Sequence, residues 1–137
     1  MPRTCLTLTA LAFTLATSLA TSLANATTYS YEPAVVTLQG TLLSSPGETP
    51  DGEKLTFPSL RLNKPITVQA PPTAPGAEAE AEKGVVLLHM ALNAKNMATF
   101  KALKGQQVKV VGTLFHADNG HHQTNVLVSP VSIERVK

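Results

Sequence analysis

Apolar and polar residues alternate with a period of two in residues 34–43, AVVTLQGTLL. This alternation, together with the β-branched side chains, predicts a strand that is buried on one face. Gly40 interrupts the segment and indicates a bulge or a sharp bend. Residues 44–53, SSPGETPDGE, are dense in turn-forming residues, and we expect them to form a loop.

Strand character returns at residues 55–57 and again at 60–68. Pro65 lacks a backbone N–H, so it favours a strand start or a sheet edge over a central position. Residues 70–83, APPTAPGAEAEAEK, hold almost nothing apolar enough to bury, and we expect a disordered surface loop. A short charged run of this kind is usually only solvated, although an acidic binding arm is the alternative.

Residues 85–92, VVLLHMAL, are continuously apolar apart from His89, which predicts a strand that is buried on both faces. After this run, either Asn93 or Asn96 can cap a short helix, and Gly105 stands where that helix would end. The apolar residues of the helix share one face and are expected to join the core: Met97, Phe100 and Leu103.

Two further strand patterns complete the chain. Residues 108–115 form the first of them and contain Gly112. The sequence Asp118-Asn119-Gly120 is typical of a β-hairpin turn, and the returning pattern covers 124–128 and 131–136.

The order of elements is therefore strand, strand, strand, short helix, strand, strand. An oligonucleotide/oligosaccharide-binding (OB) barrel has five strands in a small, partly open Greek-key barrel. In such barrels a helix commonly lies between the third and fourth strands, as it does here. Glycines within the first and fourth strands suit the bends of a small barrel. We expect an all-β fold with one short helix, a five-stranded OB-like barrel; another small β-barrel or a sandwich is the alternative.

The residues before this domain have the three-part pattern of a secretory signal peptide. Arg3 is the only charged residue, an apolar run follows, and Ala24-Asn25-Ala26 provides a cleavage site of small residues. An uncleaved membrane anchor is the alternative, but the Thr, Ser and Ala content makes the run weakly hydrophobic. We expect residues 1–26 to be removed, with a cut after Ala20 as a variant, and the protein to be periplasmic or secreted.

The remaining chain, residues 27–137, is expected to be a single, monomeric domain. The one cysteine, Cys5, leaves with the signal peptide, so stability has to come from core packing. Without Arg3, 10 basic residues face 9 acidic ones, a net charge of +1, and there is no tryptophan. Nucleic acid is therefore not an expected partner, because single strands need basic grooves and stacking aromatics. No second apolar run is long enough to span a membrane.

Candidate chemistry is concentrated in one short window that contains His116, Asp118, His121 and His122. Clustered imidazoles with a nearby carboxylate are the ligands that zinc, copper or nickel prefers, so these four residues are the candidate metal ligands. The more ordinary interpretation is that they are polar residues at a hairpin tip. One hairpin supplies too few ligands to complete a metal shell.

The hairpin register determines which of these side chains can meet. With a two-residue turn at Asn119-Gly120, Asp118 pairs with His121 and His116 with Gln123. With a three-residue loop, His116 pairs with His122 instead, and the sequence does not distinguish the two registers. His89 is expected to be a satisfied core histidine that joins the cluster only if its strand lies alongside.

Catalytic arrangements are missing from the sequence, which has no mature cysteine, no Gly-x-Ser-x-Gly motif and no suggestive pair of carboxylates. We therefore expect a non-enzymatic binding module that recognises an envelope component or a protein partner and needs no cofactor. A metal-binding envelope protein that uses the hairpin histidines is the alternative.

Three motifs resemble an uncharacterised family of small exported bacterial domains, which is catalogued as a domain of unknown function. They are YEPAVVTLQGTL at 31–42, KPITV at 64–68, and VGTLFHA at 111–117 followed by GHHQT at 120–124. The resemblance covers nearly all of residues 27–137, and its last motif is the most specific. It implies a secreted or periplasmic protein of Gram-negative type, sometimes attached to a lysozyme-inhibitor-like domain, with no established activity.

This chain differs from the family pattern at two places. Relatives often carry cysteines where this chain has Thr28, or a neighbour of it, and Thr67. If those cysteines pair in relatives, the resemblance implies that these two positions are neighbours in space. Relatives also tend to have a third histidine where Gln123 stands, which counts against a shared metal site in this chain.

Overall fold

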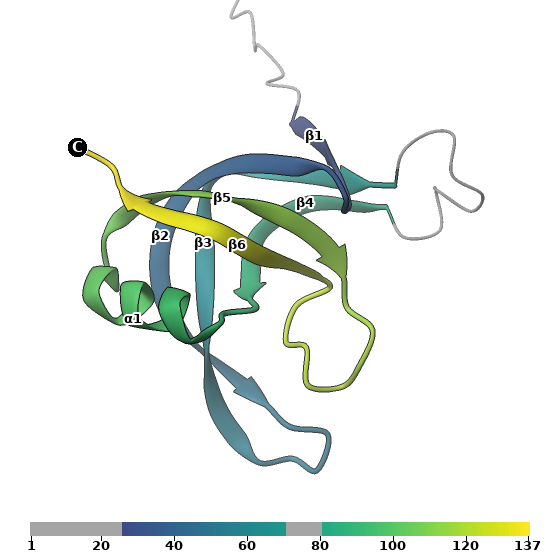
Figure 1. Ribbon diagram of the computed structural model, residues 1–137. Coiled ribbons are helices and arrows are strands. Elements are labelled where there is room, and N and C mark those ends of the chain that lie inside the picture. Colours follow the sequence, from purple (N-terminus) through teal and green to yellow (C-terminus); the bar gives the residue numbers. More distant parts are fainter. Residues whose placement is uncertain (1–25, 71–80) are drawn as a thin grey trace, which may run out of the picture.

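Within the described residues, six strands and one helix form, most of them from segments whose apolar residues alternate or repeat. The computed structural model describes residues 26–70 and 81–137. The elements in chain order are β1 (Thr27–Ser30), β2 (Val35–Glu48), β3 (Lys54–Gln69), β4 (Glu82–Met90), α1 (Ala94–Leu103), β5 (Gln107–His116) and β6 (Val126–Arg135). The structure thus confirms that the chain is rich in β-strands and has one short helix, as expected (Figure 1).

The predicted signal peptide falls almost entirely outside the described residues, and Cys5 with it. The same holds for residues 71–80 of the predicted disordered loop. The C-terminal end of that loop prediction is wrong, because β4 already begins at Glu82 and pairs there with Val68 of β3. Among the described residues, no helix has the length and apolar character that a membrane crossing requires.

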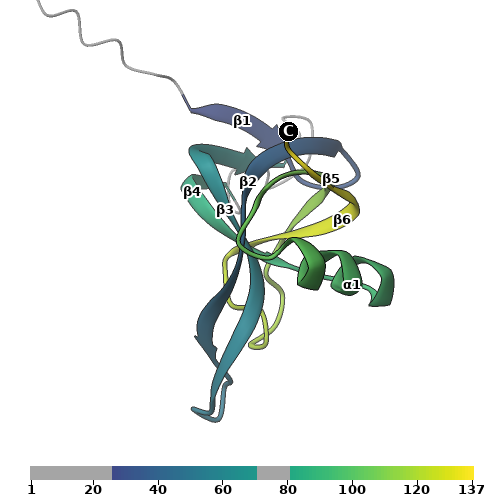
Figure 2. The same ribbon diagram turned by 90° about the vertical axis from the view of Figure 1, so that its left-hand side faces the viewer.

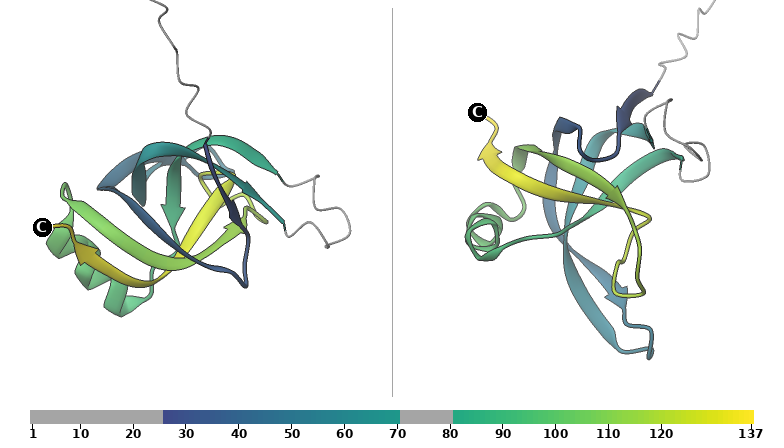
Figure 3. Two further views of the ribbon diagram at one scale, coloured as in Figure 1. Left: turned by 90° about the horizontal axis from the view of Figure 1, so that it is seen from above. Right: turned by 45° about the vertical axis from the view of Figure 1, so that its right-hand side comes forward.

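The strands form one sheet whose order is β1-β3-β2-β5-β6-β4, with a further pairing between β3 and β4. The pairings β2–β3, β2–β5, β5–β6 and β3–β4 are antiparallel, whereas β4 and β6 run parallel over the short stretch at His89 and Met90. The order of pairing therefore returns to β3, and the long strands curve around a common interior (Figure 3). The expected five strands become six because β1 adds to β3.

Strand β2 is shared between two ladders, and Gly40 marks the change. Residues 35–41 pair with β5, and residues 40–48 pair with β3. Both ladders run through Gly40 without a register shift, so of the two predicted alternatives the bulge is not observed here. A Cβ at this position would lie 2.1 Å from the carbonyl oxygen of Arg61, so only glycine permits the close approach of β3.

The core is formed by the inward faces of the strands. Fully buried members come from every long strand and include Leu42, Leu60, Leu88, Val110, Leu114 and Val128. The prediction that 85–92 is buried on both faces is wrong: Leu88 and Met90 are buried, but Val86 is 47% exposed. Towards Met90, burial along β4 therefore alternates between partly exposed and buried positions.

Half of the predicted loop at 44–53 is strand. β2 continues to Glu48, and only residues 49–53 form the turn of a long hairpin that extends away from the body of the domain (Figure 1). The polar residues here find partners across the ladder, as in the buried hydrogen bond of 2.6 Å between the hydroxyls of Ser45 and Ser59. Cross-strand partners thus outweigh the turn preference of the local sequence.

The two segments predicted at 55–57 and 60–68 form one strand, β3. Pro65 therefore lies inside a strand rather than at its start. It is tolerated because its neighbours have no ladder there: pairing with β2 ends at Leu62, and the register with β4 is interrupted before Ile66. No hydrogen bond of the sheet is lost at the proline.

Helix α1 matches the prediction closely. Asn93 is the N-cap and its side chain accepts a hydrogen bond from the backbone N–H of Asn96 at 2.8 Å. Asn96 is buried in the first turn, where its side-chain amide donates to the carbonyl of Pro130 at 2.8 Å and joins the helix to β6. Gly105 follows the helix with a φ of 85°, a backbone conformation that favours glycine.

The β5–β6 connection differs from both predicted hairpin registers. His116 pairs with Val126, so residues 117–125 form a long loop. The two strand segments predicted at 124–128 and 131–136 belong to one strand, β6. At the other end of the sheet, Thr28 of β1 pairs with Thr67 of β3. This confirms that the two positions are neighbours, as the family resemblance implied.

We predict that Gly40→Ala lowers the free energy of unfolding by about 3 kcal/mol, because the added methyl group meets backbone atoms that cannot rotate away. Gln39→Ala is the matched control, since its side chain is exposed on the adjacent position, and should cost less than about 0.5 kcal/mol. Urea unfolding followed by circular dichroism measures both. Equal losses for the two variants would contradict the close approach at Gly40.

Candidate functional site: a histidine-lined groove

The loop of residues 117–125 is fastened to the β2–β3 hairpin by one side chain, that of Gln123. Its Oε1 accepts a hydrogen bond from the backbone N–H of Glu48 at 2.9 Å, and its Nε2 donates to the backbone carbonyl of Glu48 at 3.0 Å. The amide thereby satisfies both backbone groups of Glu48, as a neighbouring strand would. The loop and the hairpin consequently lie side by side (Figure 2).

His89 of β4 lies at the inner side of this loop. Its backbone N–H donates to the hydroxyl of Thr124 at 2.9 Å, and its ring Nδ1 accepts from the backbone N–H of Gln123 at 3.2 Å. The ring packs against Phe57, with 4.9 Å between the centroids, and meets His122 edge-on at 6.2 Å. The fold therefore meets the condition under which His89 joins the histidines of the loop.

His122 continues this row of rings. Its ring meets Phe115 at 5.7 Å between centroids, and its Nδ1 lies 3.2 Å from the carboxylate of Asp118. The Nε2 is 3.3 Å from the side-chain nitrogen of Asn119. The His122 side chain is only 18% exposed, so it forms part of the wall of the site.

The other two predicted ligands lie elsewhere. The Nε2 of His116 is 3.3 Å from a carboxylate oxygen of Glu82, and its ring meets Tyr31 at 6.1 Å between centroids. His121 is exposed at the rim of the groove. Of the four predicted metal ligands, the structure thus brings together His122 and Asp118. Within 26–70 and 81–137, no group of three or more His, Cys, Asp or Glu side chains could hold a metal ion.

A pocket of about 440 Å³ opens between this loop and helix α1. Its lining comes from β3, β4, the β4–α1 connection, α1, the loop and β6: Pro58, His89, Met90, Ala91, Leu92, Met97, Asn119, His121, His122 and Leu127. A second pocket of about 430 Å³ shares Pro58 and Met97 with it and ends at Lys101 and Lys104. The two adjoining pockets are called the histidine groove below.

The groove combines an apolar floor with a basic end. Phe57, Met97 and Phe100 form the floor next to the two lysines. No carboxylate from the described ranges lines either pocket. The geometry therefore suits a ligand that has an apolar portion and a negative charge.

Burial lowers the pKa of the His89 imidazole below its usual 6.5, and repulsion from His122 lowers it further. At neutral pH the His89 side chain is consequently neutral, with its Nδ1 occupied as an acceptor. Its proton then lies on Nε2, which can donate one further hydrogen bond, and the neutral ring adds no charge to the groove.

Sequence reasoning singled out the loop histidines but missed Gln123, Thr124 and the lysines of α1 as parts of one site. A single histidine within the apolar run 85–92 was the available signal for His89. Nothing in the sequence indicated that Gln123 reaches Glu48, because the two residues are far apart along the chain.

We predict that the His89 imidazole titrates below pH 6.5 and that His122→Ala raises its midpoint, because one of the two causes is removed. His116→Ala is the control and should leave the midpoint unchanged, since His116 contacts Glu82 instead. NMR of the imidazole resonances measures all three proteins.

The lowered pKa of His89 also makes the folding stability depend on pH. The unfolded chain takes up this proton more readily, so the contribution of His89 is fully present above pH 6.5 and is lost as the pH falls through the folded pKa. A midpoint at or above 6.5 in the wild-type protein would contradict the burial of the ring.

The model of one protein family matches residues 87–136: Domain of unknown function (DUF4431). This stretch contains all four histidines, the N-cap of α1 and the loop that carries Gln123. A comparison with curated proteins gives no significant match. Over residues 87–136 the resemblance to a domain of unknown function is therefore confirmed, because this stretch is similar to the DUF4431 family.

Proposed function

We propose that this chain is an exported, non-enzymatic binding module that recognises a protein or another component of the cell envelope through the histidine groove. The observation that carries the proposal is the groove itself. The loop of residues 117–125, the β2–β3 hairpin and helix α1 come from distant parts of the sequence and converge on it, and Gln123 joins the loop to the hairpin. The signal-peptide pattern of residues 1–26 supports export.

We further propose that strands β2 to β6 form an OB-like barrel. Support comes from the antiparallel pairs β2–β3, β3–β4, β2–β5 and β5–β6, the parallel pair β4–β6, and the helix between the third and fourth of these strands. OB folds bind ligands on the face of their second and third strands, flanked by the loops that follow the first and fourth. Here that face carries His89, and the loops are 49–53 and 117–125.

The chemistry of the groove favours recognition over catalysis. His89 uses its Nδ1 for the backbone N–H of Gln123, and no serine or cysteine within the described residues is paired with it. The apolar floor and the two lysines suit an acidic partner segment with apolar side chains. Fold similarity alone would not identify the ligand, so the proposal depends on these side chains.

Capture from a cell-envelope extract tests the proposal when it is combined with groove variants. The exposed pair Lys101→Glu and Lys104→Glu reverses the basic end of the groove. The matched control reverses Lys83 and Lys95, which are also exposed but line neither pocket of the groove. We expect the wild-type and control proteins to retain a common component, identified by mass spectrometry, whereas the groove variant binds it at least about tenfold more weakly.

A set of captured components that is the same for all three proteins would overturn the proposal. Metal binding through His116, Asp118, His121 and His122 remains the alternative, and the proximity of His122 to Asp118 favours testing it. Calorimetry with zinc, copper and nickel is the test. Affinity weaker than about 1 mM, or affinity that His122→Ala leaves unchanged, would remove this alternative.

A further inference from the structure

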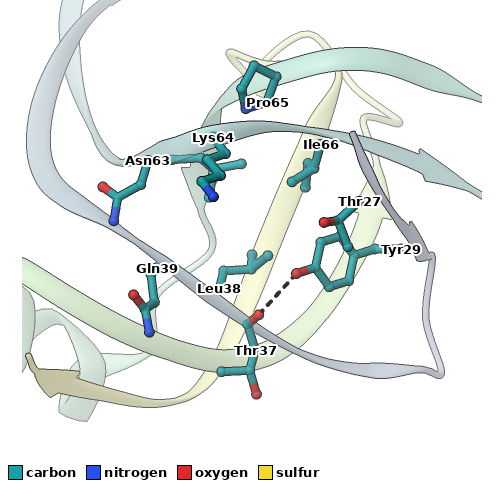
Figure 4. A pocket seen from close by; sticks show the side chains of 10 residues that line it. Thr27, Tyr29, Thr37, Leu38, Gln39, Asn63, Lys64, Pro65 and Ile66 are labelled. Atoms are coloured by element: carbon teal, nitrogen blue, oxygen red, sulfur yellow. Dashed lines mark hydrogen bonds between the residues drawn. The ribbon is translucent and has the colours of Figure 1, made fainter. Parts of the chain in front are cut away.

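A third pocket lies outside the histidine groove, at the place where β2 and β3 separate. The antiparallel ladder between them begins at Gly40 and Leu62, so residues 35–39 of β2 have no strand partner on that side in the described residues. The space between the strands is a pocket of about 360 Å³, which β1 closes at one end (Figure 4).

The backbone of β2 turns hydrogen-bonding groups toward this pocket. The N–H and C=O of Leu42 bond to Gln106 and Gly105 on the β5 side. Alternate residues of a strand point their backbone groups in the same direction, so those of Thr37 and Gln39 point away from β5. The hydroxyl of Tyr29 donates to the carbonyl oxygen of Thr37 at 3.5 Å, which confirms this direction, and an added strand would replace this long hydrogen bond (Figure 4).

An open strand edge of this kind recognises one chemistry above others, an extended peptide backbone. Exposed N–H and C=O groups at a two-residue spacing pair with a peptide that is added as a further strand. Among the described residues that line the pocket, Lys64 alone is charged, and it forms no ion pair with any of the described side chains. Its charge favours a peptide that carries a carboxylate.

We propose that the edge of β2 at Thr37 and Gln39 binds an extended, carboxylate-bearing peptide segment of a partner protein as an added strand. The leucine floor of the pocket at Leu38 and Leu62 gives the peptide apolar contact. This site shares no lining residue with the histidine groove, so its test is independent of the function proposed above.

Amide hydrogen exchange tests the open edge without any ligand. In the free protein, the amides of Thr37 and Gln39 should exchange at least about tenfold faster than those of Val36 and Leu38, which point to β5. Protection of Thr37 and Gln39 equal to that of Leu38 would overturn the proposal. So would protection that rises with protein concentration, because a second copy of the chain would then occupy the edge.

Peptide titration tests the occupant. The probe is the peptide acetyl-Thr-Val-Thr-Val-Asp with a free carboxyl terminus. Its binding is followed through the amide chemical shifts of the ¹⁵N-labelled protein. We expect saturable shifts at Thr37 and Gln39 with a Kd below about 1 mM. Thr37→Pro should weaken binding at least tenfold by removing the edge N–H, whereas the matched control Thr37→Val retains that N–H and the affinity.

Two further arms keep the test decisive if Thr37→Pro fails to fold. The same peptide with N-methyl groups on alternate amides should bind at least tenfold more weakly, and Lys64→Gln should weaken binding of the unmodified peptide about threefold. No shifts at Thr37 and Gln39, or equal binding of the N-methylated peptide, would overturn the proposal.

Discussion

The division of β2 between two partners is the constraint on which the rest of the structure depends. One half of this strand pairs with β5 and the other with β3, and the change at Gly40 requires an approach too close for a side chain. Because the partners diverge on either side of Gly40, the domain has two unlike ends. At one end the long β2–β3 hairpin contacts the loop of residues 117–125; at the other, β2 and β3 separate and leave a pocket with a leucine floor.

The hairpin end acquires its chemistry through contacts between residues that are distant in sequence. The short parallel pairing of β4 with β6 places His89 beside Leu127, and Gln123 holds the loop over it. Rings then follow one another from Phe57 through His89 and His122 to Phe115. A row of packed rings with a neutral imidazole is a rigid wall, and rigidity of this kind lowers the entropic cost of binding.

How much of this structure the sequence predicted depends on how far apart along the chain the interacting residues lie. The helix was predictable because its cap, Asn93, and its terminating Gly105 act within a few residues. The strand at residues 44–48 was not, because hydrogen bonds such as that between Ser45 and Ser59 come from the partner strand. The loop register failed for the same reason: Asn119-Gly120 favours a tight turn, but contacts such as Gln123 with Glu48 accompany a longer loop. The sequence singled out the loop that lines one side of the groove, while the residues that β4 and α1 contribute became apparent only from the fold.

Cross-strand and ring nuclear Overhauser effects measure most directly whether β4 closes the sheet against β6 and so builds the groove. The account predicts contacts between the backbone protons of Met90 and Val128, together with contacts of the His89 ring to the rings of Phe57 and His122. A well-folded protein in which Met90 shows no contact to β6, and in which the His89 ring contacts neither neighbour, would contradict it.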